Sequence, residues 1–196
     1  ADCRPVSGEI SDQEQGALAS RDCIVLYSSA ASRRGLSYFI QGTRYAKITN
    51  GIMADDTYYM RQALQEAREA ANRGEVPVGA VVVCRDRIIA RAHNLTETLT
   101  DVTAHAEMQA ITAAAGWLGG KYLNDCTLYV TVEPCVMCAG AIAWAQTGRL
   151  VYGADDEKRG FQRYAPQALH PKTQVTSGVL ADECAQLMKD FFQKRR

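Results

Sequence analysis

Two short stretches of this sequence carry residue types that bind metals and move protons. One is His105-Ala106-Glu107, and the other, further along the chain, is Pro134-Cys135-Val136-Met137-Cys138. An imidazole and two thiolates are suitable zinc ligands, and three protein ligands leave one position of a tetrahedral ion open for water, as in catalytic zinc sites. Glu107 is a hard carboxylate two residues from His105, so we interpret it as a proton carrier rather than as a fourth ligand.

The residues around both stretches predict helices that begin at the site. Thr103 is a candidate N-cap of an alanine-rich helix that includes His105. Pro134 suits the first position of a second helix, on which Cys135 and Cys138 lie three residues apart on one face. The partial positive charge at a helix N-terminus favours thiolate over thiol. Two helix starts directed at one ion would therefore form a suitable zinc site.

Two other interpretations of the same residues stay open at this point. A structural zinc site needs a fourth ligand, for which the candidates are Cys84, Cys126, Cys184, His93 and His170. A redox C-x-x-C motif would leave His105 and Glu107 without a purpose, and the residues around it are not typical of thioredoxins.

The composition favours a soluble globular protein of one domain. The 196 residues are 47% hydrophobic, and 22 Lys and Arg balance 22 Asp and Glu, so any nucleic-acid binding must come from a local basic patch. Seven scattered cysteines are an odd number, which indicates a reducing, cytoplasmic setting. We find no signal peptide and no apolar run of the roughly 18 residues that a membrane span needs, so we expect no membrane association.

The pattern of the chain changes near Met53. Residues 1–52 show no sustained period and are interpreted as a disordered leader or an extension from an upstream start codon, with an extra partner-binding segment as the alternative. Residues 53–196 are well patterned and are expected to form the zinc-dependent domain.

Helices and short apolar strands alternate in this second part. Helices are expected from Asp55 to Gly74, after Thr103, after Pro134 and from Ala181 to Lys194. Strands are expected at Val76–Cys84, Ile88–Ala92, Cys126–Val132, Leu150–Tyr152 and near Val175, with an irregular segment around Pro166 and Pro171. This order predicts an α/β protein, a three-layer α/β/α sandwich with a mixed five-stranded sheet. The site then falls where strand ends meet helix starts.

From Met53 to Arg196 the sequence resembles the bacterial tRNA-specific adenosine deaminases, the TadA family of the cytidine deaminase-like fold. The matching stretches are Gly74–Val81, Thr103–Glu107, Leu128–Ala141 and Gly178–Cys184, followed by Phe191-Phe192 and the terminal Arg195-Arg196. H-x-E with P-C-x-x-C is common to zinc deaminases and indicates the chemistry only. Val136-Met137 and the Phe-Phe basic tail favour the tRNA branch.

The resemblance implies a role for each matching residue. His105, Cys135 and Cys138 would bind one Zn²⁺ per chain, and Glu107 would shuttle protons. The implied substrate contacts are Asn94 to the flipped adenine, the Ala106 N–H at the reacting position, Val76, Pro77 and Val78 in the wall of the base pocket, and Asp156 and Lys158 at the ribose and backbone of the anticodon loop. The family also implies a homodimer whose RNA site uses residues of both chains.

Further RNA contacts are expected from local charge and from aromatic stacking. The candidates are Arg159, Phe161, Arg163 and Tyr164 in one loop, and Lys194, Arg195 and Arg196 in the tail. This loop is bulkier and more basic than in better-known members. Trp144-Ala145 replaces their His-Ser pair, and we interpret Trp144 as a core residue.

The reaction expected from the resemblance is hydrolytic deamination of adenosine to inosine at the wobble position of a tRNA anticodon loop. Two alternatives stay open. One is a deaminase of a free nucleobase or nucleoside, of the guanine or cytosine type, and the other is a zinc-stabilised interaction module without enzymatic activity.

Overall fold

The computed structural model of the chain describes residues 48–49, 52–53 and 55–195. The expectation for residues 1–52 falls almost wholly outside these ranges and stays a prediction. Two short strands, β1 (Ile48–Thr49) and β2 (Ile52–Met53), pair antiparallel with each other.

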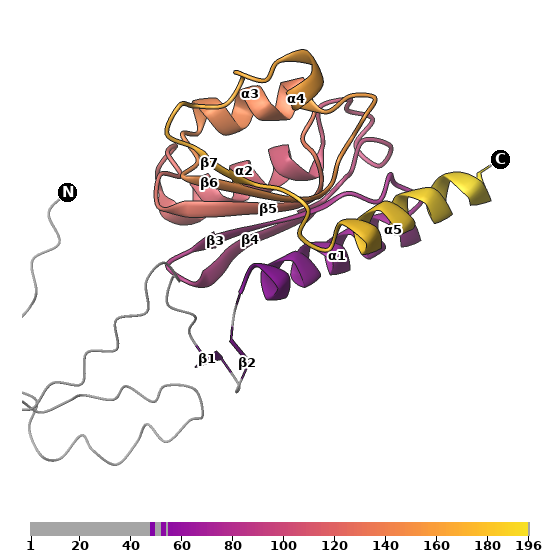
Figure 1. Cartoon of the computed structure of the whole chain (residues 1–196), viewed down its shortest axis with the longest axis horizontal. Helices are drawn as coiled ribbons and strands as arrows, with labels where there is room; N and C mark the ends of the chain where they lie inside the picture. The colour runs from indigo at the N-terminus through magenta and orange to yellow at the C-terminus, as the bar shows by residue number, and fades with distance from the viewer. Residues whose placement is uncertain (1–47, 50–51, 54, 196) are drawn as a thin grey trace, which may run out of the picture. The chain divides into compact units, whose positions relative to one another are not determined.

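A five-stranded sheet runs through the centre of the domain (Figure 1). Its strands are β3 (Gly79–Cys84), β4 (Arg87–His93), β5 (Cys126–Val132), β6 (Arg149–Ala154) and β7 (Gln174–Thr176), in the order β4-β3-β5-β6-β7. β3 pairs antiparallel with β4 and β5, whereas β6 runs parallel to both β5 and β7. The predicted mixed sheet of five strands is confirmed.

Helices cover both faces of this sheet. In the view of Figure 1, α2 (Ala106–Leu118), α3 (Val136–Trp144) and α4 (Phe161–Tyr164) lie above it, and α1 (Asp56–Asn72) and α5 (Ala181–Lys194) lie below. Alternate strand residues divide between two cores, as the pleat of a strand requires. Val82 and Val130 face α2 and α3, and Val81 and Tyr129 face α1 and α5. The three-layer prediction is confirmed.

The first helix is fixed to the sheet at its N-terminal end. Asp55 is the N-cap, and its carboxylate accepts the Tyr58 N–H at 2.8 Å. Asp56 accepts two hydrogen bonds of 2.6 Å from Arg149 and one of 2.8 Å from the Tyr129 hydroxyl. Further along, a Cβ on Gly79 would lie 2.1 Å from the Ala63 carbonyl oxygen, so α1 and β3 pack in direct backbone contact.

Three predicted element starts close to the site are wrong. The first strand begins at Gly79 and not at Val76, because Pro77 has no N–H for a ladder and the Val78 N–H turns back to the Val76 carbonyl at 2.8 Å. The N-caps of α2 and α3 are His105 and Cys135, so Thr103 and Pro134 both precede their helices.

Two side chains of the last third also differ from expectation. The prediction that Trp144 lies in the core is wrong: it is 86% exposed, since α3 turns its residues Ala139 and Ile142 toward the sheet. The four-residue helix α4 lies within the stretch expected to be irregular. It buries Phe161 against Tyr152, with ring centroids 6.5 Å apart.

Candidate active site

The three expected metal ligands come together where α2 and α3 begin. His105 and Cys135 are the N-cap residues of the two helices, and Cys138 lies in the first turn of α3. The His105 Nδ1 atom is 3.7 Å from the Cys135 Sγ and 3.4 Å from the Cys138 Sγ, and all three ligand atoms lie within 4.8 Å of one another. Both helix starts therefore contribute to one cluster of three candidate metal ligands, here called the metal cluster, that fits a single ion.

The electrostatics of the cluster favour a thiolate. A hydrogen bond from the Cys138 thiol, against the effect of burial, lowers the pKa of Cys135 to about 4. The same hydrogen bond, together with burial, raises the pKa of Cys138. The hydrogen bond between His105 and Cys135 raises the pKa of His105 as well. One negative sulfur, one further thiol and one imidazole are a donor set that suits a soft or borderline divalent cation such as zinc.

No fourth ligand joins this cluster among the described residues. His93 Nδ1 lies 3.2 Å from Glu66, and His170 accepts the Lys172 N–H. Cys84 and Cys126 are neighbours in the β3–β5 ladder, at the end of these strands away from the cluster. Cys184 belongs to α5, on the other face of the sheet. A three-ligand site with an open position fits the structure better than a closed structural site.

Glu107 lies in the first turn of α2 and is 3% exposed. Burial raises the pKa of its carboxyl group, and this is the largest influence on it. A carboxyl group with a raised pKa holds and releases a proton more readily near neutral pH, which is what a general acid and base needs. Its place beside the cluster, and outside the ligand set, agrees with the expected role of proton carrier.

Asn94 follows β4 and reaches the site through backbone contacts. Its N–H donates to the Val78 carbonyl at 3.0 Å, and the N–H of the next residue, Leu95, donates to Ala104, just before His105. Pro77 is buried, Val76 and Val78 are partly buried, and Ala106 is fully buried. The structure thus brings the expected base-pocket residues to the end of the sheet where the metal cluster lies.

Two buried carboxylates near the site were missed in the sequence. Glu75 is 0% exposed and accepts the Asn94 amide at 3.0 Å and the Thr98 N–H at 2.7 Å. Glu133 accepts the backbone N–H groups of Asp156 at 3.0 Å and Gln162 at 2.9 Å. Their positions directly before Val76 and Pro134, inside the motifs, were the signal that could have identified them.

Glu133 fixes the loop that carries the expected ribose contacts. Asp156 accepts the N–H groups of Lys158 and Arg159 at 3.0 Å each, so the loop closes on itself. Residues Cys135 and Gly160 also form an isolated antiparallel bridge. The positive charge of Arg159 lowers the pKa of His105, but the effects that raise this pKa are larger. Asp156, Lys158 and Arg159 are therefore held beside the metal cluster.

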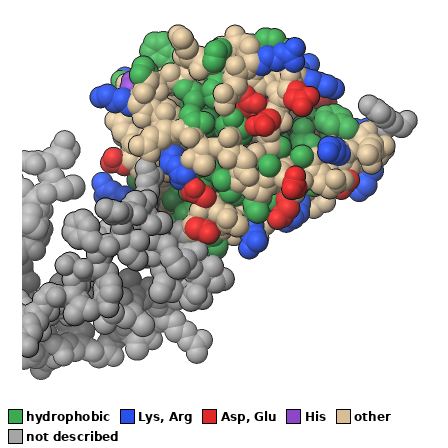
Figure 2. Space-filling model, in the orientation of Figure 1, with side chains coloured by type: hydrophobic (Ala, Val, Ile, Leu, Met, Phe, Trp, Pro, Cys, Tyr) green, Lys and Arg blue, Asp and Glu red, His purple; other side chains and the backbone are tan. Residues whose placement is uncertain are grey.

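The remaining candidates for RNA contact are not equally available. Tyr164 is 60% exposed with Arg163 stacked on its ring at 5.6 Å, whereas Phe161 is buried, so its expected stacking role is wrong. Arg195 lies 4.4 Å over the Phe191 ring and donates to the Gly74 carbonyl. Lys194 is exposed, and Arg196 lies outside the described residues. Figure 2 shows charges of both signs spread over the visible face of the domain.

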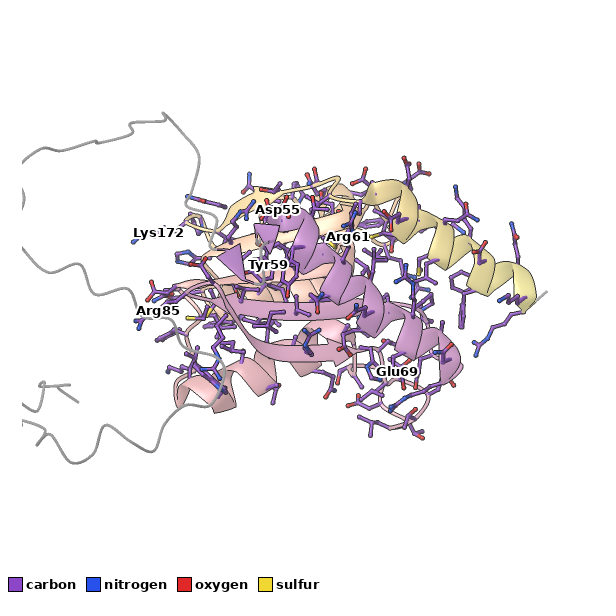
Figure 3. All side chains as sticks on the ribbon, turned by 90° about the horizontal axis from the view of Figure 1, so that it is seen from below. Asp55, Tyr59, Arg61, Glu69, Arg85 and Lys172 are labelled. Atoms are coloured by element: carbon purple, nitrogen blue, oxygen red, sulfur yellow. The ribbon has the colours of Figure 1, made fainter. Side chains whose placement is uncertain are left out.

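Two cavities lie away from the metal cluster. One of about 540 Å³ is lined by His170, Lys172 and the Asn124–Thr127 stretch, and one of about 450 Å³ by Arg85, Trp117 and Tyr122. Figure 3 labels Arg85 and Lys172 at one end of the domain and Glu69, near the end of α1, at the other. The metal cluster is at the Glu69 end, where β5 ends.

Among the described residues, no helix is both long and apolar enough to span a membrane.

The fold and this site define a deaminase of the MafB19-like family, whose sequence model matches residues 54–196. A "tRNA-specific adenosine deaminase" of Agrobacterium fabrum is 45% identical over 149 residues, which are 74% of this chain and 98% of that protein. Its counterpart in Bacillus subtilis is 44% identical over 74% of this chain and 92% of that protein. The chain belongs to the family of tRNA-specific adenosine deaminases.

Solved structures agree with this placement. One, from work on A-to-I editing by tRNA:A34 deaminases at the wobble position of transfer RNA, is 46% identical. It has a TM-score of 0.63 and covers 67% of this chain and 99% of its own. A guanine deaminase from Nitrosomonas europaea is 26% identical with a TM-score of 0.64, over 71% of this chain and 86% of its own.

Proposed function

We propose that this chain catalyses the hydrolytic deamination of adenosine to inosine at the wobble position of a tRNA anticodon loop. The observation that carries the proposal is the cluster of His105, Cys135 and Cys138 at two helix starts with the buried Glu107 beside it. Membership of the tRNA-specific adenosine deaminase family supports the choice of substrate.

His105, Cys135 and Cys138 would hold one zinc ion per chain. When bound, zinc lowers the pKa of a water to about 7 and so supplies the nucleophile at neutral pH. The thiolate of Cys135, whose pKa is lowered to about 4, is already in the form that binds metal.

Glu107 carries the protons of the reaction. It takes a proton from the attacking water and delivers it to ring nitrogen N1 while the new C6–O bond forms. It then takes the remaining proton of the new C6 hydroxyl and passes it to the 6-amino group, and the C6–N bond breaks to release ammonia and leave the 6-oxo group of inosine. Burial of the carboxyl group, which raises its pKa, supports this role because the protonated and ionised forms are then closer in free energy at neutral pH.

The remaining residues bind and orient the substrate. Asn94, Ala106 and the Val76–Val78 segment would form the pocket of the flipped base, whose unstacking costs roughly a few kcal/mol and least in an unpaired loop. Asp156, Lys158 and Arg159 would meet the ribose and backbone of the neighbouring nucleotides. Arg163, Tyr164, Lys194 and Arg196 are the further candidates for RNA contact.

A homodimer is part of the proposal, with α3 at its interface. The outward face of α3 exposes 42% of Val136, 37% of Met137 and 86% of Trp144. Three apolar side chains on one short helix support contact with a second copy of the chain. Because Val136 and Met137 lie between the two cysteine ligands, such a contact would bring the partner next to the metal cluster.

The cytoplasm is the proposed compartment. Cys84, Cys126 and Cys184, like the two cysteines of the cluster, are free, which suits a reducing environment.

Deamination of a free guanine is the second candidate function. The similarity to a guanine deaminase of the same fold, at 26% identity, favours it as the alternative. The metal cluster and the proton carrier would serve both reactions, so the substrate alone distinguishes them.

The test is ammonia release from an anticodon stem-loop with adenosine at the wobble position, compared with free adenosine, guanine and cytosine. We expect turnover of the stem-loop and at least a roughly 10²-fold loss in Glu107→Gln, with zinc still bound at one ion per chain. His105→Ala should lose the metal itself. Turnover of a free base and not of the stem-loop would show that tRNA is not the substrate. Loss of zinc from Glu107→Gln would show that Glu107 is a metal ligand.

A further inference from the structure

Glu75 is a carboxylate buried in the domain without a cationic partner among the described residues. It is 0% exposed and comes shortly after α1. Its Oε1 atom accepts the Thr98 N–H at 2.7 Å, and its Oε2 atom accepts the Glu97 N–H at 3.2 Å. Burying an ionised group is costly unless hydrogen bonds replace its hydration, so these donors must be fixed in place. Burial raises its pKa, but these hydrogen bonds outweigh that effect and the pKa is lowered.

The carboxylate also takes the side chain of Asn94. The Asn94 Nδ2 atom donates to Glu75 Oε2 at 3.0 Å and to Thr96 Oγ1 at 2.9 Å. The Thr96 hydroxyl in turn lies 3.4 Å from the same carboxylate oxygen. Both hydrogens of the amide NH₂ group are thus directed at Glu75 and Thr96.

This arrangement determines which way the Asn94 amide faces. An ionised carboxylate accepts hydrogen bonds and donates none. The NH₂ side of the amide must therefore face Glu75, and the carbonyl oxygen Oδ1 must face away from it. Without Glu75, the two orientations of an asparagine amide are similar in shape and differ only in their hydrogen bonds.

We propose that Glu75 is a positioning residue that holds the Asn94 amide with its oxygen, a hydrogen-bond acceptor, toward the substrate nucleoside. Asn94 would then accept an N–H or O–H of the nucleoside and offer it no donor. The backbone supports this placement, since the Leu95 N–H donates to the Ala104 carbonyl and so fixes Asn94 beside the start of α2. The inference rests on the proposed function, because it requires a nucleoside bound at the cluster.

The variant Glu75→Gln keeps the shape and weakens the constraint. One acceptor oxygen becomes an NH₂ group, which meets a donor on either side, the Thr98 N–H or the Asn94 NH₂, and the neutral amide oxygen that is left holds the Asn94 NH₂ less strongly than a carboxylate does. We expect kcat/KM for the stem-loop to fall roughly 10- to 100-fold, the range of one unsatisfied buried hydrogen bond. Zinc content should stay at one ion per chain. The control Glu69→Gln removes an exposed carboxylate of α1 at the same end of the domain (Figure 3) and should act as the wild type.

A reciprocal exchange separates positioning from mere support of the fold. Asn94→Asp alone places two carboxylates against each other and should be nearly inactive. In the double variant Glu75→Gln with Asn94→Asp, the new amide at position 75 can donate to one oxygen of the new carboxylate at position 94. The other oxygen of that carboxylate then faces the substrate as an acceptor. We expect kcat/KM of the double variant to exceed that of Asn94→Asp by at least about tenfold, the worth of one hydrogen bond to a charged group.

Two results would overturn the inference: full activity of Glu75→Gln, or a double variant no more active than the weaker single variant. A wild-type chain that deaminates only a free base would instead overturn the proposed tRNA substrate. The wild type and its four variants, assayed on that base, would then still decide the role of Glu75.

Discussion

Gly160 lies directly against the carboxylate of Glu133. A Cβ at position 160 would stand 2.2 Å from the Glu133 Oε2 atom, far inside contact distance. The backbone of Gly160 has φ −56° and ψ 140°, which any residue can adopt, so the restriction is purely one of space. The same glycine bridges to Cys135, a proposed metal ligand, and the N–H of its neighbour Phe161 donates to the Pro134 carbonyl. Glu133 and Gly160 together fasten the 156–162 loop to the start of α3.

Gly160→Ala should therefore displace this loop. We expect a loss of about 1–3 kcal/mol in the free energy of unfolding, as for overpacking elsewhere, and a lower kcat/KM for the stem-loop with zinc still bound. Urea unfolding and metal analysis measure both effects. Gly116→Ala is the control, since a Cβ there meets nothing within 4 Å, and in a helix it should stabilise by about 0.5–1 kcal/mol. Equal stability of Gly160→Ala and wild type would show that Glu133 moves aside freely.

The lowered pKa of Glu75 makes its contribution to stability depend on pH. Its hydrogen bonds to the Thr98 and Glu97 N–H groups favour the ionised form in the folded chain, below the ordinary value of 4.5. A carboxyl group with a lowered folded pKa stabilises the protein above its unfolded pKa, and this stability is lost as the pH falls through the folded pKa. The difference in unfolding free energy between wild type and Glu75→Gln should be constant from about pH 7 to about pH 5. It should shrink below about pH 4.5, and a difference that stays constant to about pH 3 would contradict the assignment.

The parts of the site that could be predicted are those with local spacing. His105, Glu107, Cys135 and Cys138 are close in sequence to the helix starts that position them, and the structure brings them together. The bounds of β5 and α5 agree with prediction as well, since both carry clear apolar patterns.

The parts that could not be predicted depend on contacts between distant segments. Glu75 and Glu133 bind backbone N–H groups of loops far along the chain, and a sequence shows only a carboxylate beside a motif. The prediction that Trp144 is a core residue is wrong because α3 is apolar on every side. Which side faces the sheet is decided by packing of Ala139 and Ile142, and periodicity does not distinguish it.

Trp144→Glu tests the proposed dimer. A charge on the exposed face of α3 should prevent the burial of Val136 and Met137 against a second copy, so the chain should become monomeric in sedimentation at micromolar concentration. Trp117→Glu is the matched control, since Trp117 is also exposed, at 53%, but lies at the end of α2 away from the cluster. It should stay dimeric. A dimer that survives Trp144→Glu would remove α3 from the interface.

The proposed domain boundary at Met53 predicts the effect of truncation. A chain that begins at Met53 keeps Asp55 and Asp56, which cap α1 and bind Arg149. We expect its unfolding free energy to change by less than about 1 kcal/mol, or roughly 2–4 °C in Tm. A chain that begins at Tyr58 loses both aspartates and should be less stable by at least about 1 kcal/mol. A large loss already in the first truncation would show that residues 1–52 contribute to the domain.

The C-terminal basic residues should divide into one that supports the fold and others that are available to RNA. Arg195 stacks on Phe191 and bonds the carbonyl of Gly74, one residue before Glu75, so Arg195→Ala should lower the Tm. Lys194 is exposed on the last turn of α5. Replacing Lys194 and Arg196 with alanine should leave the Tm and the zinc content unchanged.

If these two side chains neutralise phosphates, the double variant should also change the salt dependence of binding. The slope of log affinity for the stem-loop against log salt is negative, and it should become shallower by about 0.7 to 0.9 for each phosphate that is no longer neutralised. Filter binding of Glu107→Gln, with and without the two alanine substitutions, measures this without turnover. An unchanged slope would exclude Lys194 and Arg196 from RNA contact and leave the Asp156–Tyr164 loop as the remaining basic surface beside the site.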